Sequence, residues 1–305
     1  MSYVSQGSAP LLYREGLRKD FRDDYDMYEP EHPAFIRTGT TDKPEVSATI
    51  FTSLSRMYEV DDGESPVFER PVPGPKVSAV DKEFAVGVQI GRKAIEDDLY
   101  GKLKQSAKWL AHAARMTYEY RAAAFLDDAF SGSTFLGVDG KKLCATDHTF
   151  LNAAGTWSNA AATPVGFSVT GVTALLDLAM LAKDHNGDPI KVMPDTVIIG
   201  NNAADYHKAL QIFGSDKDPF TANNADNAIK KRMPKPKIEI SRFKTSTKSY
   251  FMIDSKLNDA WFLVRRAVNM HDWKDEKTGA IMAKVDTRFI IWFVDPRGWY
   301  GSNPS

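Results

Sequence analysis

The chain has 305 residues, 43% of them hydrophobic, which is enough for a buried core in one elaborated domain or two smaller ones. Its 39 basic and 40 acidic side chains leave a formal net charge of −1, so the basic excess typical of a dedicated nucleic-acid-binding protein is missing. The single cysteine, Cys144, excludes an intrachain disulfide and a cysteine-rich zinc site. We expect Cys144 to be a small buried side chain in a protein made in a reducing, intracellular place.

The beginning of the chain carries no export or membrane signal. Its first ten residues are polar and lack the apolar segment of a signal peptide. No run approaches the ~18 apolar residues of a membrane-spanning helix, and the most apolar window is residues 289–294. We therefore expect a soluble protein without membrane contact.

Residues 1–48 form a leader in which charges of both signs surround several aromatic side chains. A short amphipathic helix is predicted over residues 11–21, and prolines keep the following segment extended. Such a segment cannot bury its aromatic side chains within itself, so it either docks on another surface or forms a disordered tail. Its aromatic residues favour docking, because disordered tails are poor in them. They are Tyr13, Phe21, Tyr25 and Tyr28.

Residues 49–82 are predicted to form a two-stranded excursion. Residues 49–60 are rich in β-forming side chains, Asp61-Asp62-Gly63 is a turn signal, and residues 65–80 return with four prolines. An isolated two-stranded ribbon is only marginally stable in water, so this one needs a partner surface. The alternative is an ordinary edge hairpin that folds on its own domain, and the sequence leaves both open.

A short strand over residues 84–90 and one long helix follow. Apolar side chains repeat at spacings of three and four, which keeps them on one face of a helix. They are Leu99, Leu103, Ala107, Leu110, Ala114, Tyr118, Ala122, Phe125 and Ala129. The polar face is expected to carry Lys102, Gln105, Lys108, His112, Arg115 and Glu119. At ~1.5 Å per residue the helix spans roughly 45 Å, the length of a structural girder.

After a loop-rich stretch, residues 131–166, the pattern becomes α/β. Thr170 is predicted to cap a helix whose apolar face is Val172, Leu175, Leu176, Ala179 and Met180, and residues 185–189 are a stop signal. A buried strand over residues 196–200 precedes a second helix, capped by Asn201 or Asn202. The remaining expected elements are a helical piece at 225–231, strands at 238–243, 249–254 and 260–265, and a long hairpin with strands at 271–275 and 280–294. The second half of its return strand is predicted to be buried on both faces.

The carboxylates and the histidines do not form a recognisable catalytic or metal site. Glu96, Asp97 and Asp98 point about 100° apart on a helix and are expected to favour the helix N-terminus electrostatically. The pair Asp147 and His148 lacks a second histidine at metal-binding spacing, so we expect a loop histidine hydrogen-bonded to its neighbour. We assign no catalytic, cofactor-binding or metal-binding residue, and we expect no enzyme.

The nucleotide and phosphate motifs are also missing from the sequence. There is no P-loop and no Gly-x-Ser-x-Gly elbow, and Gly87 to Gly91 lacks the third glycine of a dinucleotide fingerprint. One basic cluster could touch phosphates, but a solvated charged loop is the favoured interpretation. Its members are Lys230, Lys231, Arg232, Lys235 and Lys237.

An ordered set of segments resembles the major capsid protein of tailed bacteriophages. The segments are 84–100 (FAVGVQIGRKAIEDDLY), 139–148 (DGKKLCATDH), 193–200 (MPDTVIIG), 286–288 (DTR) and 295–299 (DPRGW). Their amino-acid sequences are most similar to those of Mu-type major head proteins, and the resemblance covers most of residues 84–301. It implies an α+β chain with the Hong Kong 97-type phage capsid fold.

The resemblance also implies a division of the chain. It comprises an N-terminal arm at 1–48, an extended β-hairpin loop at 49–82, a peripheral domain with a long spine helix at 83–165 and 270–305, and an axial α/β domain at 166–269. In this family the arm and loop lie on neighbouring subunits, which gives partners to both unpartnered segments. A hinge is expected at the roots of the loop, at Gly63 and Gly74, and along the helix. Some members cross-link a loop lysine, but nothing around Lys76 supports that here.

The implied function is a structural one. Pentamers and hexamers of the chain would form an icosahedral shell around double-stranded DNA without sequence-specific binding, and the shell would be assembled in the bacterial host cytoplasm and found in the virion. Partners would include portal and scaffolding proteins, and could include decoration proteins. Two alternatives remain open: an encapsulin-like nanocompartment shell, and an enzyme that uses Asp147 and His148.

Overall fold

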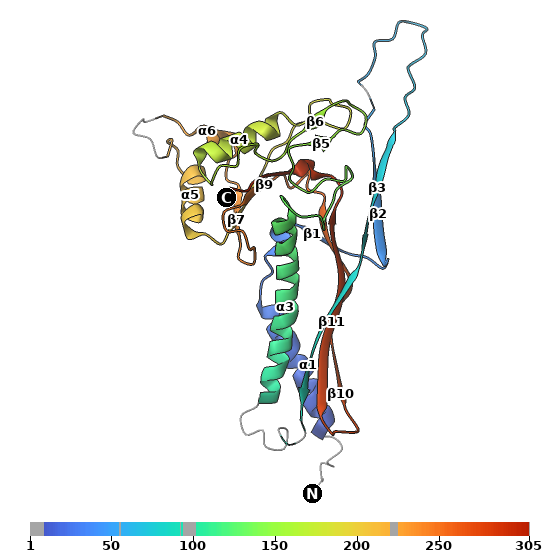
Figure 1. Cartoon of the computed structure of the whole chain (residues 1–305), viewed down its shortest axis with the longest axis vertical. Helices are drawn as coiled ribbons and strands as arrows, with labels where there is room; N and C mark the ends of the chain where they lie inside the picture. Colours follow the sequence, from blue (N-terminus) through green and yellow to red (C-terminus); the bar gives the residue numbers. More distant parts are fainter. Residues whose placement is uncertain (1–8, 55, 92, 94–101, 220–224, 305) are drawn as a thin grey trace.

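The molecule has a long stem, a lobe on top of the stem and a projecting loop (Figure 1). The computed structural model describes residues 9–54, 56–91, 93, 102–219 and 225–304. Its helices are α1 (Ala9–Met27), η1 (His32–Ala34), α3 (Lys102–Asp128), α4 (Val169–Met180), α5 (Ala203–Gly214), α6 (Ala228–Arg232) and η2 (Pro296–Gly298).

The strands form two four-stranded and two two-stranded sheets. Their orders are β1-β10-β11-β4, β12-β9-β7-β8, β2-β3 and β5-β6. The strands are β1 (Arg37–Thr40), β2 (Glu45–Phe51), β3 (Pro73–Val80), β4 (Lys82–Ile90), β5 (His148–Thr149), β6 (Thr156–Trp157), β7 (Thr196–Gly200), β8 (Lys237–Ser241), β9 (Tyr250–Ile253), β10 (Ala260–Lys274), β11 (Ile281–Phe293) and β12 (Trp299–Ser302).

Helix α3 is the girder that its apolar spacing predicts. Its 27 residues extend roughly 40 Å along the stem, beside β4 and β11 (Figure 1). The predicted stripe from Ala107 to Ala129 is buried, whereas Leu99 and residues 96–98 lie outside the described residues. The prediction for Glu119 is wrong: this residue was expected on the exposed polar face of the helix, but it is only 4% exposed.

The leader docks on the stem of its own chain. Helix α1 runs from Ala9 to Met27, longer than predicted, and Phe21 joins a core cluster with residues of α3, β10 and β11. After the short η1 helix, Phe35 and Ile36 enter the main core and β1 pairs in parallel with β10. Docking is therefore confirmed, and the surface that the leader covers belongs to this chain.

The stem sheet is covered on both faces in its upper half. Phe262, Phe289 and Phe293 pack towards α3 in the main core. On the other face, Ile290, Trp292 and Val294 pack with apolar residues of β2 and β3. This arrangement confirms that the second half of β11 is buried on both sides. It also gives the β2–β3 ribbon a partner on its own chain.

The first strand of the β10–β11 hairpin, β10, is longer than predicted. The strand predicted to end at residue 265 continues to Lys274, so two predicted strands form one. Register shifts near Arg266 accommodate the bend of this long strand. Gly279, with a φ of +68°, closes the turn, where a left-handed backbone favours glycine.

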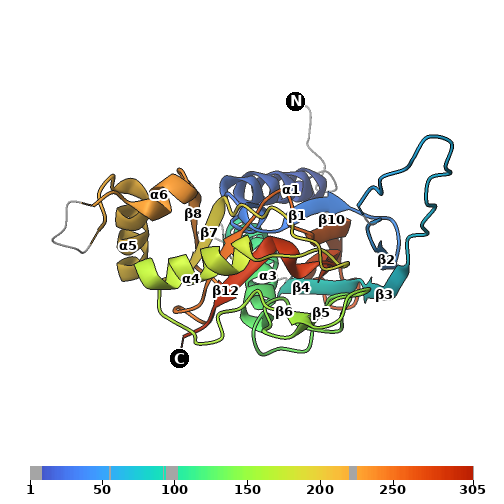
Figure 2. The same ribbon diagram turned by 90° about the horizontal axis from the view of Figure 1, so that it is seen from above.

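The lobe consists of the second four-stranded sheet with α4, α5 and α6 (Figure 2). Asn202 caps α5 as expected, but Ser168 caps α4 in place of the predicted Thr170. Met180 was predicted on the buried face of α4 and is exposed. Strand β12, from the end of the chain, pairs with β9 inside the lobe. The boundaries of the predicted arm, loop, peripheral domain and axial domain stay a prediction.

Candidate assembly surface

The segment between β2 and β3, which we call the loop tip (residues 52–72), projects away from the body (Figure 1). Strands were predicted on both sides of its turn, but β2 ends at Phe51 and β3 begins at Pro73. Prolines 66 and 71 remove backbone donors there, which disfavours a ladder. Gly63, proposed as a root hinge, instead lies in the turn at the far end with a φ of +89°. Gly74 does lie at the root, in close contact with Leu151.

The loop tip exposes apolar side chains that its own chain leaves uncovered. Met57 is 100% exposed and Phe68 is 88% exposed. Other exposed apolar side chains of this region are Phe51, Leu54, Tyr58, Val60, Val67 and Val72. Single exposed apolar residues are ordinary, but a concentration of them on one projecting segment is typical of an interaction site.

The base of the loop tip is held by a polar turn of the lobe. Ser53 donates from Oγ to Asp184 (2.5 Å), and Asn186 donates from Nδ2 to the Ser53 carbonyl oxygen (2.6 Å). Arg56 forms an ion pair with Asp188 at 2.9 Å. Burial alone would raise the pKa of Asp184, but hydrogen bonds from Ser53 and two backbone amides outweigh it and the pKa is lowered. These contacts tie the base of the loop tip to residues 184–188.

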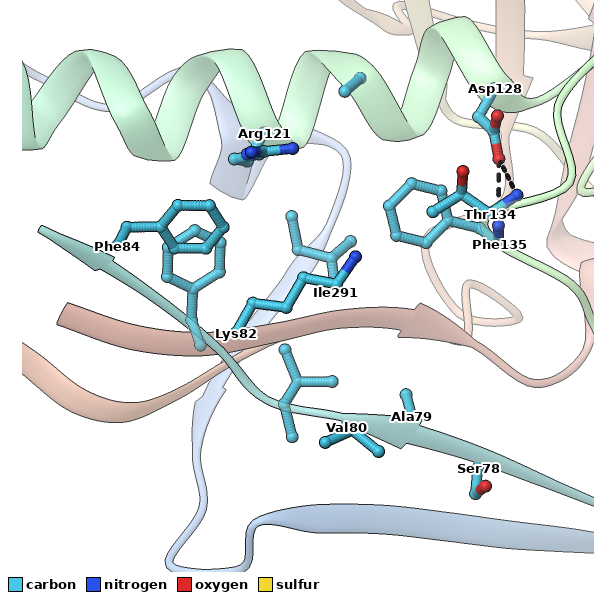
Figure 3. A pocket seen from close by; sticks show the side chains of 13 residues that line it. Ser78, Ala79, Val80, Lys82, Phe84, Arg121, Asp128, Thr134, Phe135 and Ile291 are labelled. Carbon is cyan, nitrogen blue, oxygen red and sulfur yellow. Dashed lines mark hydrogen bonds between the residues drawn. The ribbon is translucent and has the colours of Figure 1, made fainter.

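A groove lies on the stem, between α3 and the chain that runs from β3 into β4 (Figure 3). Its volume is about 390 Å³, and its apolar walls include Phe84, Phe135 and Ile291. Two exposed basic side chains, Lys82 and Arg121, also line it. The Arg121 guanidinium lies 4.7 Å from the centre of the Phe84 ring. The groove therefore combines apolar walls with positive charge.

The one carboxylate of the groove is engaged by the backbone. Asp128 accepts hydrogen bonds from the Thr134 and Phe135 amides, both at 3.0 Å (Figure 3). Gly132 makes this turn possible, because a Cβ at that position would meet the Asp128 carboxylate at 1.4 Å. In the described part of the chain, neither Lys82 nor Arg121 has a carboxylate partner.

The arm meets the stem through a buried polar contact that the sequence did not indicate. His32 donates to Glu119 from its ring Nδ1 (2.8 Å) and from its backbone N–H (3.1 Å). Further down, the Arg115 guanidinium lies 4.1 Å from the centre of the Tyr25 ring and donates to the Tyr25 carbonyl oxygen at 2.9 Å. These contacts attach the arm to the stem of its own chain.

The predicted pairing of Asp147 with His148 is wrong. The His148 ring is fully buried, 2.6 Å from Asp139 and 3.0 Å from Asn159, while Asp147 pairs with Lys141 on the surface. Burial would raise the pKa of Asp139, but the hydrogen bond and charge of His148 together with backbone amides lower it. The buried ring is not accessible from solvent, and it links Asp139 with Asn159.

The basic cluster of the lobe is largely paired with carboxylates. Lys230 contacts Asp216 at 2.6 Å, Lys231 contacts Asp226 at 2.6 Å, and Arg232 contacts Asp177 at 2.8 Å. Such pairs neutralise most of its charge, as expected of a solvated charged loop. Cys144 is buried as predicted, and burial raises the pKa of its thiol well above the ordinary value.

The described residues contain no group of three or more His, Cys, Asp or Glu side chains that could hold a metal ion. A search for membrane-spanning helices over the same residues found no helix with the required length and apolarity.

Comparisons with known proteins show which family and which solved structures this chain resembles. A family model described as phage capsid protein matches residues 76–301. A search of curated proteins gave no match.

Several solved structures share the fold. A virus-like particle from Pyrococcus furiosus is 11% identical, with a TM-score of 0.53 over 94% of this chain and 98% of that one. A chain of Microbacterium phage Oxtober96 is 10% identical, with a TM-score of 0.55 over 91% and 92%. The capsid structure of cyanophage P-SCSP1u is 13% identical, with a TM-score of 0.56 over 87% and 84%. At these identities the likeness shows the fold alone.

Proposed function

The chain belongs to the phage capsid protein family, and we propose from this premise that it is the major capsid protein of a tailed phage, of the Hong Kong 97 type and nearest to Mu-type head proteins. A shell-forming role in a virion agrees with the family and with the mixed helix-and-sheet fold shared with phage capsids. The division into arm, extended loop, peripheral domain and axial domain at the boundaries given above is part of this proposal.

In this proposal, copies of the chain assemble as pentamers and hexamers into a closed icosahedral shell. Closed symmetry requires edges that complement one another between identical copies. The formal charge of −1 suits a container, because packaged double-stranded DNA can then lie against the wall without tight phosphate contacts. Portal, scaffolding and decoration proteins would join the shell at its vertices and surfaces, and assembly would take place in the bacterial host cytoplasm.

The exposed apolar loop tip is the observation that carries the proposal. A fully exposed Met57 and a largely exposed Phe68 are hard to explain in a solitary subunit. Contact with neighbouring copies would cover them, and a standard stable interface buries roughly 1,600 Å². Because the arm is docked on its own stem, the loop tip is the segment that reaches a neighbour.

The test is the assembly state of the purified full-length chain. Size-exclusion chromatography followed by negative-stain electron microscopy should show large hollow particles of uniform diameter. Monomers that persist at high protein concentration, with no particles in the images, would contradict the proposal. That outcome, combined with a catalytic activity of the monomer, would favour the enzyme alternative instead.

The encapsulin-like alternative has one supporting observation, the fold shared with the Pyrococcus furiosus particle. The match to a phage capsid family model favours the phage shell. The contents of particles purified from the producing cells separate the two. Nuclease-protected double-stranded DNA supports a phage capsid, whereas a protein cargo without DNA supports a nanocompartment.

A further inference from the structure

We propose that His185 is a pH-sensitive latch, which ties the base of the loop tip to the η2 segment while its ring is neutral and releases it when the ring is protonated. All the contacts involved lie within one subunit. The inference therefore goes beyond the proposed shell function and does not depend on it.

The His185 ring is buried against the side chain of Arg297 in η2. The Arg297 Nη1 lies 2.5 Å from the ring Nε2, and the Arg297 Nη2 lies 3.0 Å from the ring Nδ1. A guanidinium has only N–H donors, so the ring must offer it a bare nitrogen, as a neutral imidazole does. A protonated ring has no bare nitrogen and would place two cations in contact, at a site where His185 is 8% exposed and Arg297 is 5% exposed.

Other contacts hold Arg297 in place. Its Nε donates to the Lys183 carbonyl oxygen at 2.8 Å, and its Nη1 donates to Asp295 at 2.9 Å. The guanidinium also lies 5.0 Å from the centre of the Trp157 ring. Because Arg297 is held from several sides, we expect repulsion from a protonated ring to displace His185 and not Arg297.

One carboxylate opposes this repulsion. The Asp295 Oδ2 lies 3.5 Å from the His185 Nε2, farther away than Arg297, and it is already paired with Arg297 at 2.9 Å. A protonated His185 would leave two cations and one carboxylate in a buried place, an excess of positive charge that is costly there. The other charged groups on the elements packed around the ring are Lys183, Asp184 and Asp188 of the turn, Arg56 of the loop tip, and the Asp139–His148 pair, whose ring stacks on Trp157.

His185 lies in the turn that holds the loop tip. Asp184 accepts hydrogen bonds from two backbone amides of this turn, at 2.9 and 2.8 Å, so the turn forms one compact unit. The same carboxylate accepts a hydrogen bond from Ser53, and Asp188 pairs with Arg56. A displacement of His185 is therefore passed to the contacts that hold Ser53 and Arg56 at the base of the loop tip.

The other buried histidines in the described part of the chain face carboxylates. The His32 ring contacts Glu119 at 2.8 Å, and the His148 ring contacts Asp139 at 2.6 Å. Protonation leaves such contacts intact, because a charged ring can donate from both nitrogens. Acid is therefore expected to break the contact of His185 and to leave those of His32 and His148 in place.

The direction of the pH effect follows from the partner. An imidazole ordinarily changes its charge between about pH 5 and 8. The closed latch excludes the proton, whereas a released ring can bind it in water, so acid favours release. If the released ring titrates like an unperturbed histidine, near about pH 6.5, the equilibrium constant for release should rise about tenfold from pH 7.5 to pH 5.5.

The motion of the loop tip tests the latch. Met57→Cys places a thiol at a fully exposed position, and the native Cys144 is buried, so a fluorescent dye can be attached selectively. The anisotropy of the dye is followed from pH 8 to pH 5 on the full-length chain, at a concentration at which sedimentation shows single subunits. With His185 present, the anisotropy should fall with a midpoint between about pH 5 and 7.

Two substitutions hold the latch in its two states. His185→Gln offers Arg297 an amide oxygen at every pH, so the anisotropy should stay at its high value. His185→Lys carries a positive charge throughout this range and should give the low value even at pH 8. His207→Gln, which removes an exposed histidine of α5, is the control and should keep the transition. Circular dichroism verifies that each variant is folded at both ends of the pH range.

The outcomes decide the inference without reference to particles. An anisotropy that does not change with pH when His185 is present overturns it, and so does an undiminished transition in His185→Gln. If His185→Gln does not fold, a high anisotropy of His185→Lys at pH 8 overturns it instead. Failure of the latch leaves the shell function standing, because that function is tested by particle formation.

Discussion

The arm and the loop tip resemble each other in sequence, but the arm is packed on the stem and the loop tip is exposed. Both precede residue 82, and both carry aromatic side chains without a local partner. Phe21 of the arm is 5% exposed, whereas Phe68 of the loop tip is 88% exposed. In the arm, Phe21 and Tyr25 are four residues apart on one face of α1, and this face meets the stem. The loop tip has prolines and clustered acids instead. Periodicity thus separates the segment that docks within the chain from the one left for a partner.

The largest expected effect comes from removing the loop tip. Replacing residues 54–71 with a short Gly-Ser turn should abolish particle formation while the free energy of unfolding of the subunit changes by less than about 0.5 kcal/mol. The reason is that Ser53 keeps its anchoring contacts and the removed apolar side chains are exposed. Electron microscopy and thermal unfolding measure the two quantities. Particles of normal size from this variant would remove the loop tip from the interface.

Much of the fold follows from periodicity in the sequence. The buried stripe of α3, the strand at Thr196–Gly200 and the cap at Asn202 are all predicted, because each is a local signal. The double burial of β11 also follows from its apolar run, and the structure supplies the two covering layers. Errors concentrate where tertiary contacts override local preference, as at the exposed Met180.

The next effect tests the docked side of the comparison. Phe21→Ala removes a ring packed between α1 and the stem and should lower the free energy of unfolding by about 3 kcal/mol, the cost typical of a buried Phe. Phe68→Ala, the matched change in the loop tip, should lower it by less than about 0.5 kcal/mol and instead slow assembly. Denaturant unfolding of both variants measures the difference. Equal losses would mean that the two aromatic residues are buried alike.

The contact between His32 and Glu119 should have a smaller effect. Glu119→Ala leaves two buried donors of His32 without an acceptor and should cost about 2 kcal/mol. Glu119→Gln keeps one side-chain oxygen as an acceptor and should cost less. Unfolding free energies measure both, and limited proteolysis shows whether the arm is released. A Gln variant as unstable as the Ala variant would mean that hydrogen bonding is not the main contribution.

Contacts of this kind lie beyond sequence reasoning. His32 and Glu119 are 87 positions apart, and Glu119 falls beside the apolar stripe, where a polar face was expected. The groove has the same origin, since Lys82 and Arg121 meet only after β4 and α3 pack together. The loop tip was recognisable from composition, but the groove was not. A surface made by one segment can be read from the sequence, whereas a surface made by several must be seen folded.

The smallest expected effect is a pH dependence confined to the packed side of the comparison. Burial raises the pKa of Tyr118 to about 12, against an opposing hydrogen bond to Thr287. The unfolded chain ionises this group near pH 10, so its contribution to stability is complete below pH 10 and is lost as the pH rises towards 12. Between pH 9 and 11 the wild type should lose about 1 kcal/mol through this residue. Tyr118→Phe should reduce that loss, whereas Tyr58→Phe, an exposed ring of the loop tip, should not. Identical pH slopes for all three proteins would show that burial against the arm and sheet does not govern the ionisation of Tyr118.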